Sequence, residues 1–476
     1  MRAMSASYRP APRFPKLGDG YADSVTAARF PKHVLRFRNQ RAAESVGLGD
    51  LDAAAWERHF AAFEALPHNL ERPLALRYHG HQFGTYNPTL GDGRGFLFAQ
   101  LIDAQGRLLD LGTKGSGQTP WSRGGDGRLT LKGGVREVLA TEMLEALGVP
   151  TSRSFSLFET GEALARGDEP SPTRSSVLVR LSHSHIRFGT FQRLAYANDA
   201  SRMTGLLDFA IEHYIPEAAA GLRDPAAAFL RAVTHRSAEL CAGWMCAGFV
   251  HGVLNTDNMN ITGESFDYGP YRFMPTYDPD FVAAYFDHSG LYAFGRQPST
   301  VSWNLTRLAD ALRTIAEAGD DAPLGAALSD FEPAFHAAMR ARLLARLGVE
   351  SRGEDEDDRL VHLIFAFLED VAIPFEQVFF DWYGGVASEA RATRGPVAEA
   401  YASERFLVVR EALSLHAPRQ RAREHVASAA YFAGREPCTL LIDEIESIWE
   451  AIAARDDWSL FDDKVRRIRE MGEYTL

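Results

Sequence analysis

The hydrophobic pattern of the chain changes from strand-like to helix-like near its middle. In the first half, two apolar runs, Phe96 to Ile102 and Leu108 to Gly112, flank the turn DAQGR, which predicts a β-hairpin. The later run SSVLVRLS predicts another buried strand that ends near Ser182. The second half carries apolar residues at helical spacing, as in DPAAAFLRAVTHRSAELCAGWMCAGFVHG, SWNLTRLADALRTIAEAG and RLVHLIFAFLEDV. We therefore expect an α+β fold with its strands first and most of its helices afterwards.

The composition narrows the class of protein. Of 476 residues, 46% are hydrophobic and 24% are charged, a balance typical of a folded protein long enough for two lobes. A net charge of -12 argues against nucleic acid as the main partner, because binding to a phosphate backbone needs a basic surface. No run of about 18 apolar residues occurs, so we expect no membrane partner. Cys241, Cys246 and Cys438 do not make a disulfide framework, which favours a reducing, cytoplasmic location.

The segment HGVLNTDNMNITGESFDYGP, residues 251–270, carries the most specific chemistry of the chain. In kinases, a segment H-G-D-x-x-x-x-N supplies an aspartate that accepts the substrate proton and an asparagine that holds metal. Here Val253 stands at the aspartate position, whereas Asn258 and the Asp267 of DYG are retained. The intervening MNITGESF predicts a tight hairpin around Gly263 and Glu264 that returns both side chains to one point, where their oxygens suit Mg²⁺. Taken alone, the same two residues fit ordinary turns better.

Lys114 and Glu137 form a second candidate pair. Lys114 ends the strand-like run LLDLGTK, and Glu137 lies in VREVLATEMLEALG, whose apolar residues recur at helical spacing. A lysine at a strand end can reach nucleotide phosphates when a carboxylate on the next helix positions it. Taken separately, each residue is more often a surface charge. The order of strand lysine, helix glutamate, asparagine and aspartate is that of a kinase site.

Other motifs in the first half could bind phosphate. Glycines in LGDGRG (residues 90–95) and GSGQTPWSRGGDGR (residues 115–128) allow backbone N–H groups to approach phosphate oxygens, although neither segment is a Walker A motif. Arg180 and Arg187 in VRLSHSHIRFGTFQ present planar forks that suit phosphate, although an isolated arginine is more often in a surface ion pair. His79 and His81 in HGHQFGTYNP lack the partner residues of a metal site, so structural roles are expected.

A β-rich first part, a helical second part and a phosphate-type site at their junction predict a two-lobed protein-kinase-like fold. We expect a β-rich N-lobe over residues 1–190, with the phosphate-binding strands, the glycine-rich loops and the Lys/Glu helix. An α-helical C-lobe would follow over residues 191–476 and hold the metal-binding segment 251–270. The acidic run GEDEDDR, residues 353–359, is expected to be a solvated loop between helices.

Together these motifs resemble the selenoprotein O (SelO) family of pseudokinase protein adenylyltransferases. The resemblance covers about Phe14 to Leu312 and rests on the strings HGHQFGTYNP, LGDGRG, KGSGQTPWSRGGDGR, VREVLATEMLEALGVPTSR, SHIRFGTF, FVHGVLNTDNMNITGESFDYGP and QPSTVSWNL. It implies that ATP binds in an orientation flipped relative to kinases. AMP would then be transferred to Ser, Thr or Tyr hydroxyls of protein substrates, and pyrophosphate would leave.

The resemblance also implies roles for particular residues. Asp257 matches the proposed catalytic base, Lys114 the phosphate-contacting lysine and Glu137 the residue that positions it. Asn258 and Asp267 match the ligands of Mg²⁺, or of Mn²⁺. Asp267 also matches a residue that contacts ATP. The other residues that match the ATP-binding pocket are Gly91, Gly93, Arg94, Asp126, Gly127, Arg180 and Arg187. The chain departs from many family members at its C-terminus, REMGEYTL, which carries no cysteine.

Three alternatives remain open from the sequence. One is protein uridylyl transfer from UTP with Mn²⁺, because the sequence does not identify the residues that contact the nucleobase. A second is an ordinary protein kinase that uses Asp257 as a displaced base, although Val253 weighs against it. The third is a catalytically silent nucleotide-binding scaffold, against which the retained Lys, Glu, Asn and Asp residues weigh.

Overall fold

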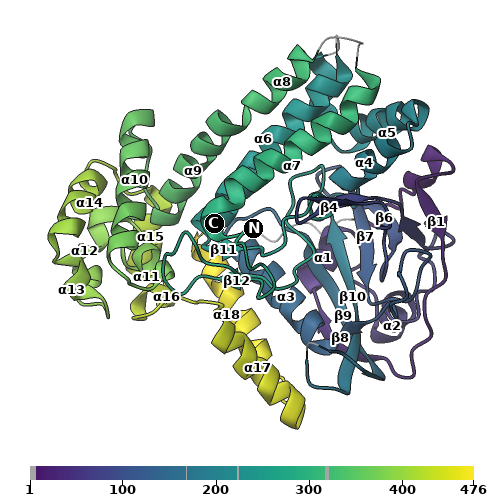
Figure 1. Cartoon of the computed structure of the whole chain (residues 1–476). Coiled ribbons are helices and arrows are strands. Elements are labelled where there is room, and N and C mark those ends of the chain that lie inside the picture. The colour runs from purple at the N-terminus through teal and green to yellow at the C-terminus, as the bar shows by residue number, and fades with distance from the viewer. Residues whose placement is uncertain (1–6, 168, 222–223, 317–320, 476) are drawn as a thin grey trace.

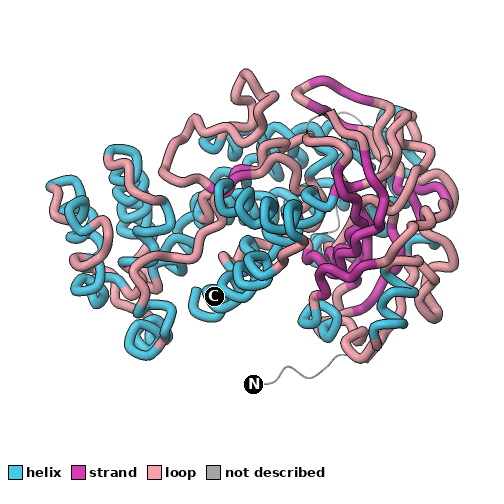
Figure 2. Tube along the Cα trace, turned by 90° about the horizontal axis from the view of Figure 1, so that it is seen from below, coloured by secondary structure: helices cyan, strands magenta, loops and turns pink. Residues whose placement is uncertain are grey.

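The computed structural model describes residues 7–167, 169–221, 224–316 and 321–475 (Figure 1). The fold is mixed α/β, with a curled antiparallel sheet at one end and many helices (Figure 2). Within the described chain the main sheet has eight strands in the order β1-β3-β6-β7-β10-β9-β2, with β8 paired to β10. Their bounds are Ala22–Ser24 (β1), Val34–Arg38 (β2), Leu74–Leu76 (β3), Leu97–Ile102 (β6), Leu108–Lys114 (β7), Leu129–Thr130 (β8), Arg153–Leu164 (β9) and Thr173–Ser182 (β10).

The predicted hairpin is confirmed as β6 and β7, which pair antiparallel on either side of the DAQGR turn. The predicted strand that ends near Ser182 is β10, which pairs with β7. In this register Lys114 lies opposite Leu178, and Gly112 lies opposite Arg180. Because side chains two residues apart share one face of a sheet, Lys114 and Arg180 project from the same face.

Helices cover both faces of the sheet. On the face that carries Lys114, helix α3 (Leu131–Ala146) packs Val138 and Leu139 into a core that includes Leu157 and Leu178. On the other face, helix α2 (Ala53–Phe60) contributes Trp56 and Phe60, and α1 (Gln40–Ser45) contributes small residues, to a core that includes Phe155 and Val179. Most residues of β10 are buried, and successive side chains project to opposite faces: Leu178 joins the core under α3, whereas Val177 and Val179 join the core under α1 and α2.

Beyond the sheet the chain is mainly helical, as predicted. Most residues of helix α6 (Pro225–Cys246) are buried, and the helix packs against α7 (Gln297–Leu312), α8 (Ala322–Ser329) and α9 (Phe331–Leu347) (Figure 1). The remaining helices next to this group are α10 (Glu354–Asp370), α11 (Phe375–Asp381), α12 (Glu389–Ala392), α13 (Ala398–Tyr401), α14 (Glu404–Ser414), α15 (Gln420–Ser428) and α16 (Ala430–Ala433). None of the described helices is long and apolar enough to cross a membrane.

The acidic run GEDEDDR is not the loop that we expected. Its acidic residues form the first turn of α10, which begins at Glu354 and is N-capped by Gly353. Carboxylates in the first turn of a helix are stabilised by the partial positive charge of that helix end. Acidic side chains that would favour a solvated loop therefore stabilise the start of a helix in this protein.

The last two helices return to the sheet. Helix α17 (Ile442–Arg455) and helix α18 (Ser459–Thr475) pack against α3. Arg469 on α18 donates Nε and Nη2 to the buried carboxylate of Glu142 on α3, at 2.7 and 2.8 Å. The C-terminal helices therefore brace the helix that carries Glu137.

Candidate functional site

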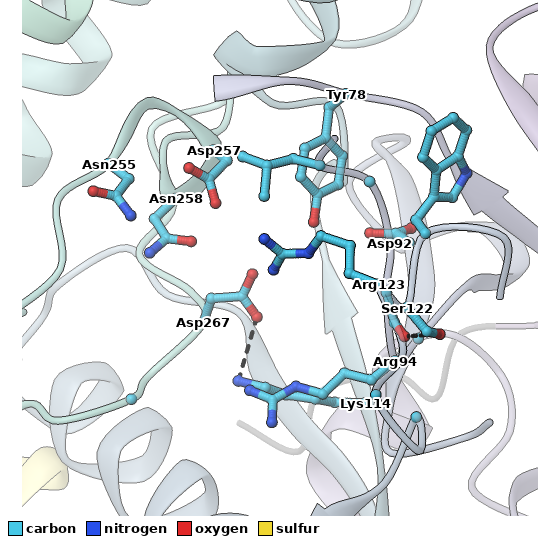
Figure 3. Close-up of a pocket in the computed structure, with 18 of the residues that line it drawn as sticks. Tyr78, Asp92, Arg94, Lys114, Ser122, Arg123, Asn255, Asp257, Asn258 and Asp267 are labelled. Carbon is cyan, nitrogen blue, oxygen red and sulfur yellow. Dashed lines mark hydrogen bonds and ion pairs between the residues drawn. The ribbon is translucent and has the colours of Figure 1, made fainter. Parts of the chain in front are cut away.

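The residues predicted for the site come together around one cavity of about 670 Å³. It lies between the sheet, the two glycine-rich segments and the segment 251–270 (Figure 3). The predicted residues that line it are Gly91, Gly93, Arg94, Lys114, Asp126, Gly127, Arg180, Arg187, Asp257, Asn258 and Asp267, and Glu137 stands directly behind Lys114. Strands, loops and the segment 251–270 thus all contribute to a single site.

Lys114 and Glu137 form a buried ion pair. The Nζ of Lys114 donates to Oε1 of Glu137, and both side chains are buried. The same Nζ lies 3.4 Å from Oδ1 of Asp267. Since α3 packs on the face of the sheet from which Lys114 projects, the helix holds the ammonium group at the edge of the cavity.

Asp267 is surrounded by cations. Arg180 donates Nη1 to its Oδ1 at 2.5 Å, and Arg187 donates Nη1 to its Oδ2 at 2.6 Å. Burial alone would raise the pKa of this carboxyl, but Arg180, Arg187 and Lys114 hold it well below its usual range, so Asp267 is ionised. Its backbone is left-handed (φ 61°), a conformation that aspartate tolerates better than most residues.

The cavity carries more cations than anions. Among the described lining residues, seven are basic and four are acidic, which gives an excess that suits a polyphosphate. The Nε atoms of Arg180 and Arg187 are buried and have no hydrogen-bond partner within the described part of the chain. A buried donor without a partner is unfavourable, so holding both guanidinium groups against Asp267 lowers the stability of the fold at this point.

Asp257 and Asn258 occupy a single helical turn, Thr256–Asn258. Arg187 donates Nη1 to the backbone oxygen of Asp257 at 2.7 Å, which fixes the turn beside Asp267. Burial raises the pKa of the Asp257 carboxyl to about 6, and Arg187 partly offsets this. Val253, at the usual position of a kinase base, borders the cavity with an apolar side chain.

The donor atoms of the site fit Mg²⁺. Asn258 donates Nδ2 to the backbone oxygen of Val253 at 2.9 Å, and its carboxamide oxygen faces the cavity (Figure 3). Together with a carboxylate oxygen of Asp267, it offers the one or two protein ligands that Mg²⁺ usually takes beside phosphate and water. Among the described residues, no cluster of three or more His, Cys, Asp or Glu side chains is placed to hold a metal by itself.

The segment 251–270 turns back as expected, but its arms do not pair with each other. Asn260 forms a bridge with Arg187, and Ser265 forms one with Thr151. Between them, Oδ1 of Asn260 accepts hydrogen bonds from the backbone of Thr262 and Glu264, which closes the turn. The expected hairpin is therefore a capped turn anchored to neighbouring segments.

The glycine-rich loops pack on each other. A Cβ at Gly91 would lie 2.4 Å from Cγ of Trp121, so only glycine permits this contact. Asp126 is held by Arg166, whose Nη1 lies 2.8 Å from Oδ2. The contact between Gly91 and Trp121 thus joins the two loops, which together line one side of the cavity.

Some lining residues were missed by the sequence reasoning. Tyr78 packs its ring over the guanidinium of Arg187 at 4.5 Å, and the partly buried Asp92 lies 3.5 Å from the same arginine. Tyr78 directly precedes the motif HGHQFGTYNP, and Asp92 lies within LGDGRG. Their closeness in sequence to these motifs could therefore have identified them as site residues. Arg166 lies outside every motif, and no sequence signal pointed to it.

Comparison with known proteins assigns the chain to a family. The family model "Protein adenylyltransferase SelO" matches residues 3–469. A relative named "Protein nucleotidyltransferase YdiU" from Synechocystis sp. is 45% identical over 480 residues, which span 98% of this chain and 98% of the relative. Relatives of the same name from Trichormus variabilis and Gloeobacter violaceus are 44% and 46% identical over 98% of this chain and 97% and 96% of their own lengths. The chain therefore belongs to the SelO family.

Proposed function

We propose that the protein transfers AMP from ATP to Ser, Thr or Tyr hydroxyls of other proteins and releases pyrophosphate. The observation that carries this proposal is the replacement of the kinase base by Val253 in a cavity where Lys114, Arg180, Arg187 and Asp267 remain clustered. A site arranged in this way retains the groups that bind phosphate but lacks a base at the position that kinases use for γ-phosphoryl transfer. The names of the family model and of the relatives, adenylyltransferase and nucleotidyltransferase, support the same class of reaction.

In the proposed reaction the acceptor oxygen attacks the α-phosphorus of ATP. A new oxygen–phosphorus bond forms, and the bond from the α-phosphorus to the oxygen that bridges it to the β-phosphorus breaks. The hydroxyl proton passes to the carboxylate of Asp257, and the bonding electrons leave with pyrophosphate. Lys114, Arg180 and Arg187 offset the charge on the phosphates, so catalysis rests on positioning and electrostatic stabilisation.

Mg²⁺ is the proposed metal, with Mn²⁺ as an alternative, and it would be held by Asn258 and Asp267. When bound, the ion supplies additional neutralisation of phosphate charge. Arg180 and Arg187 each hold Asp267 through one nitrogen, so their guanidinium groups stay at the cavity beside the proposed metal ligand. Glu137 keeps Lys114 directed into the cavity.

We also propose the kinase-like two-lobed division, with residues 1–190 as the first lobe and 191–476 as the second. In support, every strand of the main sheet lies before residue 183 within the described chain. Helices α17 and α18 belong to the second part of the sequence but pack against α3 of the first. The C-terminus would thus tie the two lobes together.

The test is incubation with ATP labelled at either the α- or the γ-phosphorus, with Mg²⁺ and a protein acceptor. Retention of the α label on protein, with release of the γ label in pyrophosphate, is the expected outcome. Retention of the γ label alone would identify a kinase instead. A parallel reaction with α-labelled UTP and Mn²⁺ separates AMP transfer from UMP transfer, and nucleotide binding without any label on protein would identify a silent scaffold.

A further inference from the structure

The exposed aromatic rings of the protein gather beside the candidate active site. Ten large hydrophobic side chains are exposed in the described chain, and five of them are aromatic. All five lie on or around the small hairpin formed by β4 (Gly80–Gln82) and β5 (Thr85–Asn87). We call these five side chains the aromatic surface: Phe83, Tyr196, Tyr285, Phe286 and Trp303.

Ring contacts join the aromatic surface to the hairpin. Phe83 at the tip lies 5.9 Å from Phe286, whose ring lies 5.1 Å from that of Tyr285. Along the hairpin, His81 packs edge-on against Trp303 at 5.3 Å. Tyr86 stacks on Tyr196 at 5.4 Å. Three of the exposed rings thus contact each other and two contact the hairpin, a clustering more typical of an interaction site than of scattered surface hydrophobics.

The hairpin is fixed to the turn that carries Asp257. The backbone N–H of His81 donates to Oγ1 of Thr256 at 2.7 Å, and that of Phe83 donates to Oδ1 of Asn255 at 3.2 Å. A Cβ built on Gly80 would lie 2.8 Å from Oδ1 of Asp257. Gln82 lines the cavity, whereas Phe83, the next residue, is exposed. The aromatic surface is therefore continuous with the side of the cavity where Asp257 stands.

Phe83 occupies a backbone position that disfavours it. Phe83 and Gly84 both have positive φ, 50° and 75°, as in a type I′ turn. Asn-Gly is the favoured pair in such a turn, and a bulky residue with positive φ is strained. The ring lies 4.9 Å from that of Tyr292 and 5.9 Å from that of Phe286, yet 39% of the residue stays exposed and open to a partner. A strained and exposed aromatic residue beside an active site points to a binding role.

The hairpin carries no charge that would select a charged partner. Its sequence, GHQFGTYN, contains no Asp, Glu, Lys or Arg. Burial lowers the pKa of His79 to about 4 and also lowers that of His81, so both rings are neutral near pH 7. Nucleic acid would require cations here. The chemistry fits apolar side chains of a polypeptide.

We propose that the aromatic surface binds apolar side chains that flank the acceptor hydroxyl of the protein substrate, with Phe83 as the main specificity-determining residue. This inference rests on the proposed function, because it assigns the aromatic surface to the acceptor of that reaction. The acceptor hydroxyl would reach Asp257 along the inner side of the hairpin, while its neighbouring residues lie on Phe83, Phe286 and Tyr285. A partner with polar residues around the hydroxyl would gain little from these rings.

The test compares two fluorescent peptides that share one acceptor hydroxyl, flanked in one by Leu and Phe and in the other by Asn and Gly. Phe83→Asn removes the ring with its contacts to Tyr292 and Phe286 but installs a residue that suits the turn, so the melting temperature should change little. Leu407→Asn, which removes an exposed side chain on the distant helix α14, is the matched control. Binding is followed by anisotropy, and transfer is followed with α-labelled ATP.

We expect Phe83→Asn to raise the Kd and the KM for the apolar peptide about tenfold, the effect of losing one buried aromatic contact. The kcat at saturating peptide, the KM for ATP and the binding of the polar peptide should stay unchanged, and Leu407→Asn should behave as wild type. Equal effects of the two variants, or equal losses for both peptides, would overturn the proposal. So would Phe83-dependent binding to phosphatidylcholine vesicles without any effect on the peptides. A wild-type protein could also bind the apolar peptide more tightly than Phe83→Asn does, yet transfer no α label. That result would support the aromatic surface and contradict the proposed function.

Discussion

Lys114 and Glu137 form an ion pair within the protein, joining the last residue of β7 to helix α3. Breaking a buried pair by removing one partner leaves an uncompensated charge and costs about 3–5 kcal/mol. We expect Glu137→Ala to lose about 3 kcal/mol of unfolding free energy, at the lower end of that range because Asp267 stays near Lys114. Lys114→Met/Glu137→Leu should lose much less unfolding free energy, since no lone charge remains.

Urea denaturation measures the unfolding free energies of the single and double variants. A double variant that loses as much as the sum of the two single variants would contradict this expectation. The double variant should still lack transfer activity.

Replacing Asp267 tests the cluster of cations. Asp267→Asn keeps the size of the side chain but leaves Arg180 and Arg187 without their shared carboxylate. We expect transfer to fall about 100-fold or more, in line with the loss of one electrostatic group from an active site. Nucleotide binding, measured by calorimetry without metal, should persist because the cations remain. Near-normal transfer by the variant would rule out a metal-holding role for Asp267.

Asp257 can be tested directly and through its neighbour. Asp257→Asn should lower kcat about 100-fold, the usual contribution of a general base, with little change in the KM for ATP. Gly80→Ala should lower kcat in the same direction, because the new methyl group would lie 2.8 Å from Oδ1 of Asp257 and displace it. Gly325→Ala, where no atom lies within 4 Å of the added group, is the control. A Gly80→Ala enzyme as active as this control would show that the position of Asp257 is unimportant.

The attachment of the C-terminal helices should weaken in acid. Partial burial works against ionisation of Asp456, but hydrogen bonds from Arg174, Trp458 and Arg36 lower its pKa to about 2. A carboxyl with a lowered pKa in the folded state stabilises the fold above its unfolded pKa and loses that effect as pH falls. The contribution is on the order of 0.5 kcal/mol, because the side chain is half exposed and screened by solvent. Unfolding free energies should therefore converge for wild type and Asp456→Asn between about pH 4 and pH 2. A constant difference across that range would contradict the assignment.

Much of the site could be predicted from sequence because each residue sits in a local pattern. Lys114 ends a strand that an apolar run beside a turn identifies, and Glu137 lies on a helix that periodicity identifies. Their contact follows from the packing of that helix on the sheet. Other features depend on contacts between distant segments. Arg166 lines the cavity and pairs there with Asp126, forty residues earlier, and the arms of the 251–270 turn pair with Arg187 and Thr151. The acidic start of α10 was misjudged because charge alone does not distinguish a solvated loop from a capped helix end.

The most direct test of the account is the intact mass of a protein acceptor after incubation with the enzyme, ATP and Mg²⁺. We predict an added mass equal to one AMP, which forms about 100-fold more slowly when Asp257→Asn replaces the wild-type enzyme. An added mass equal to one phosphate, or an AMP addition that is unaffected by Asp257→Asn, would contradict it.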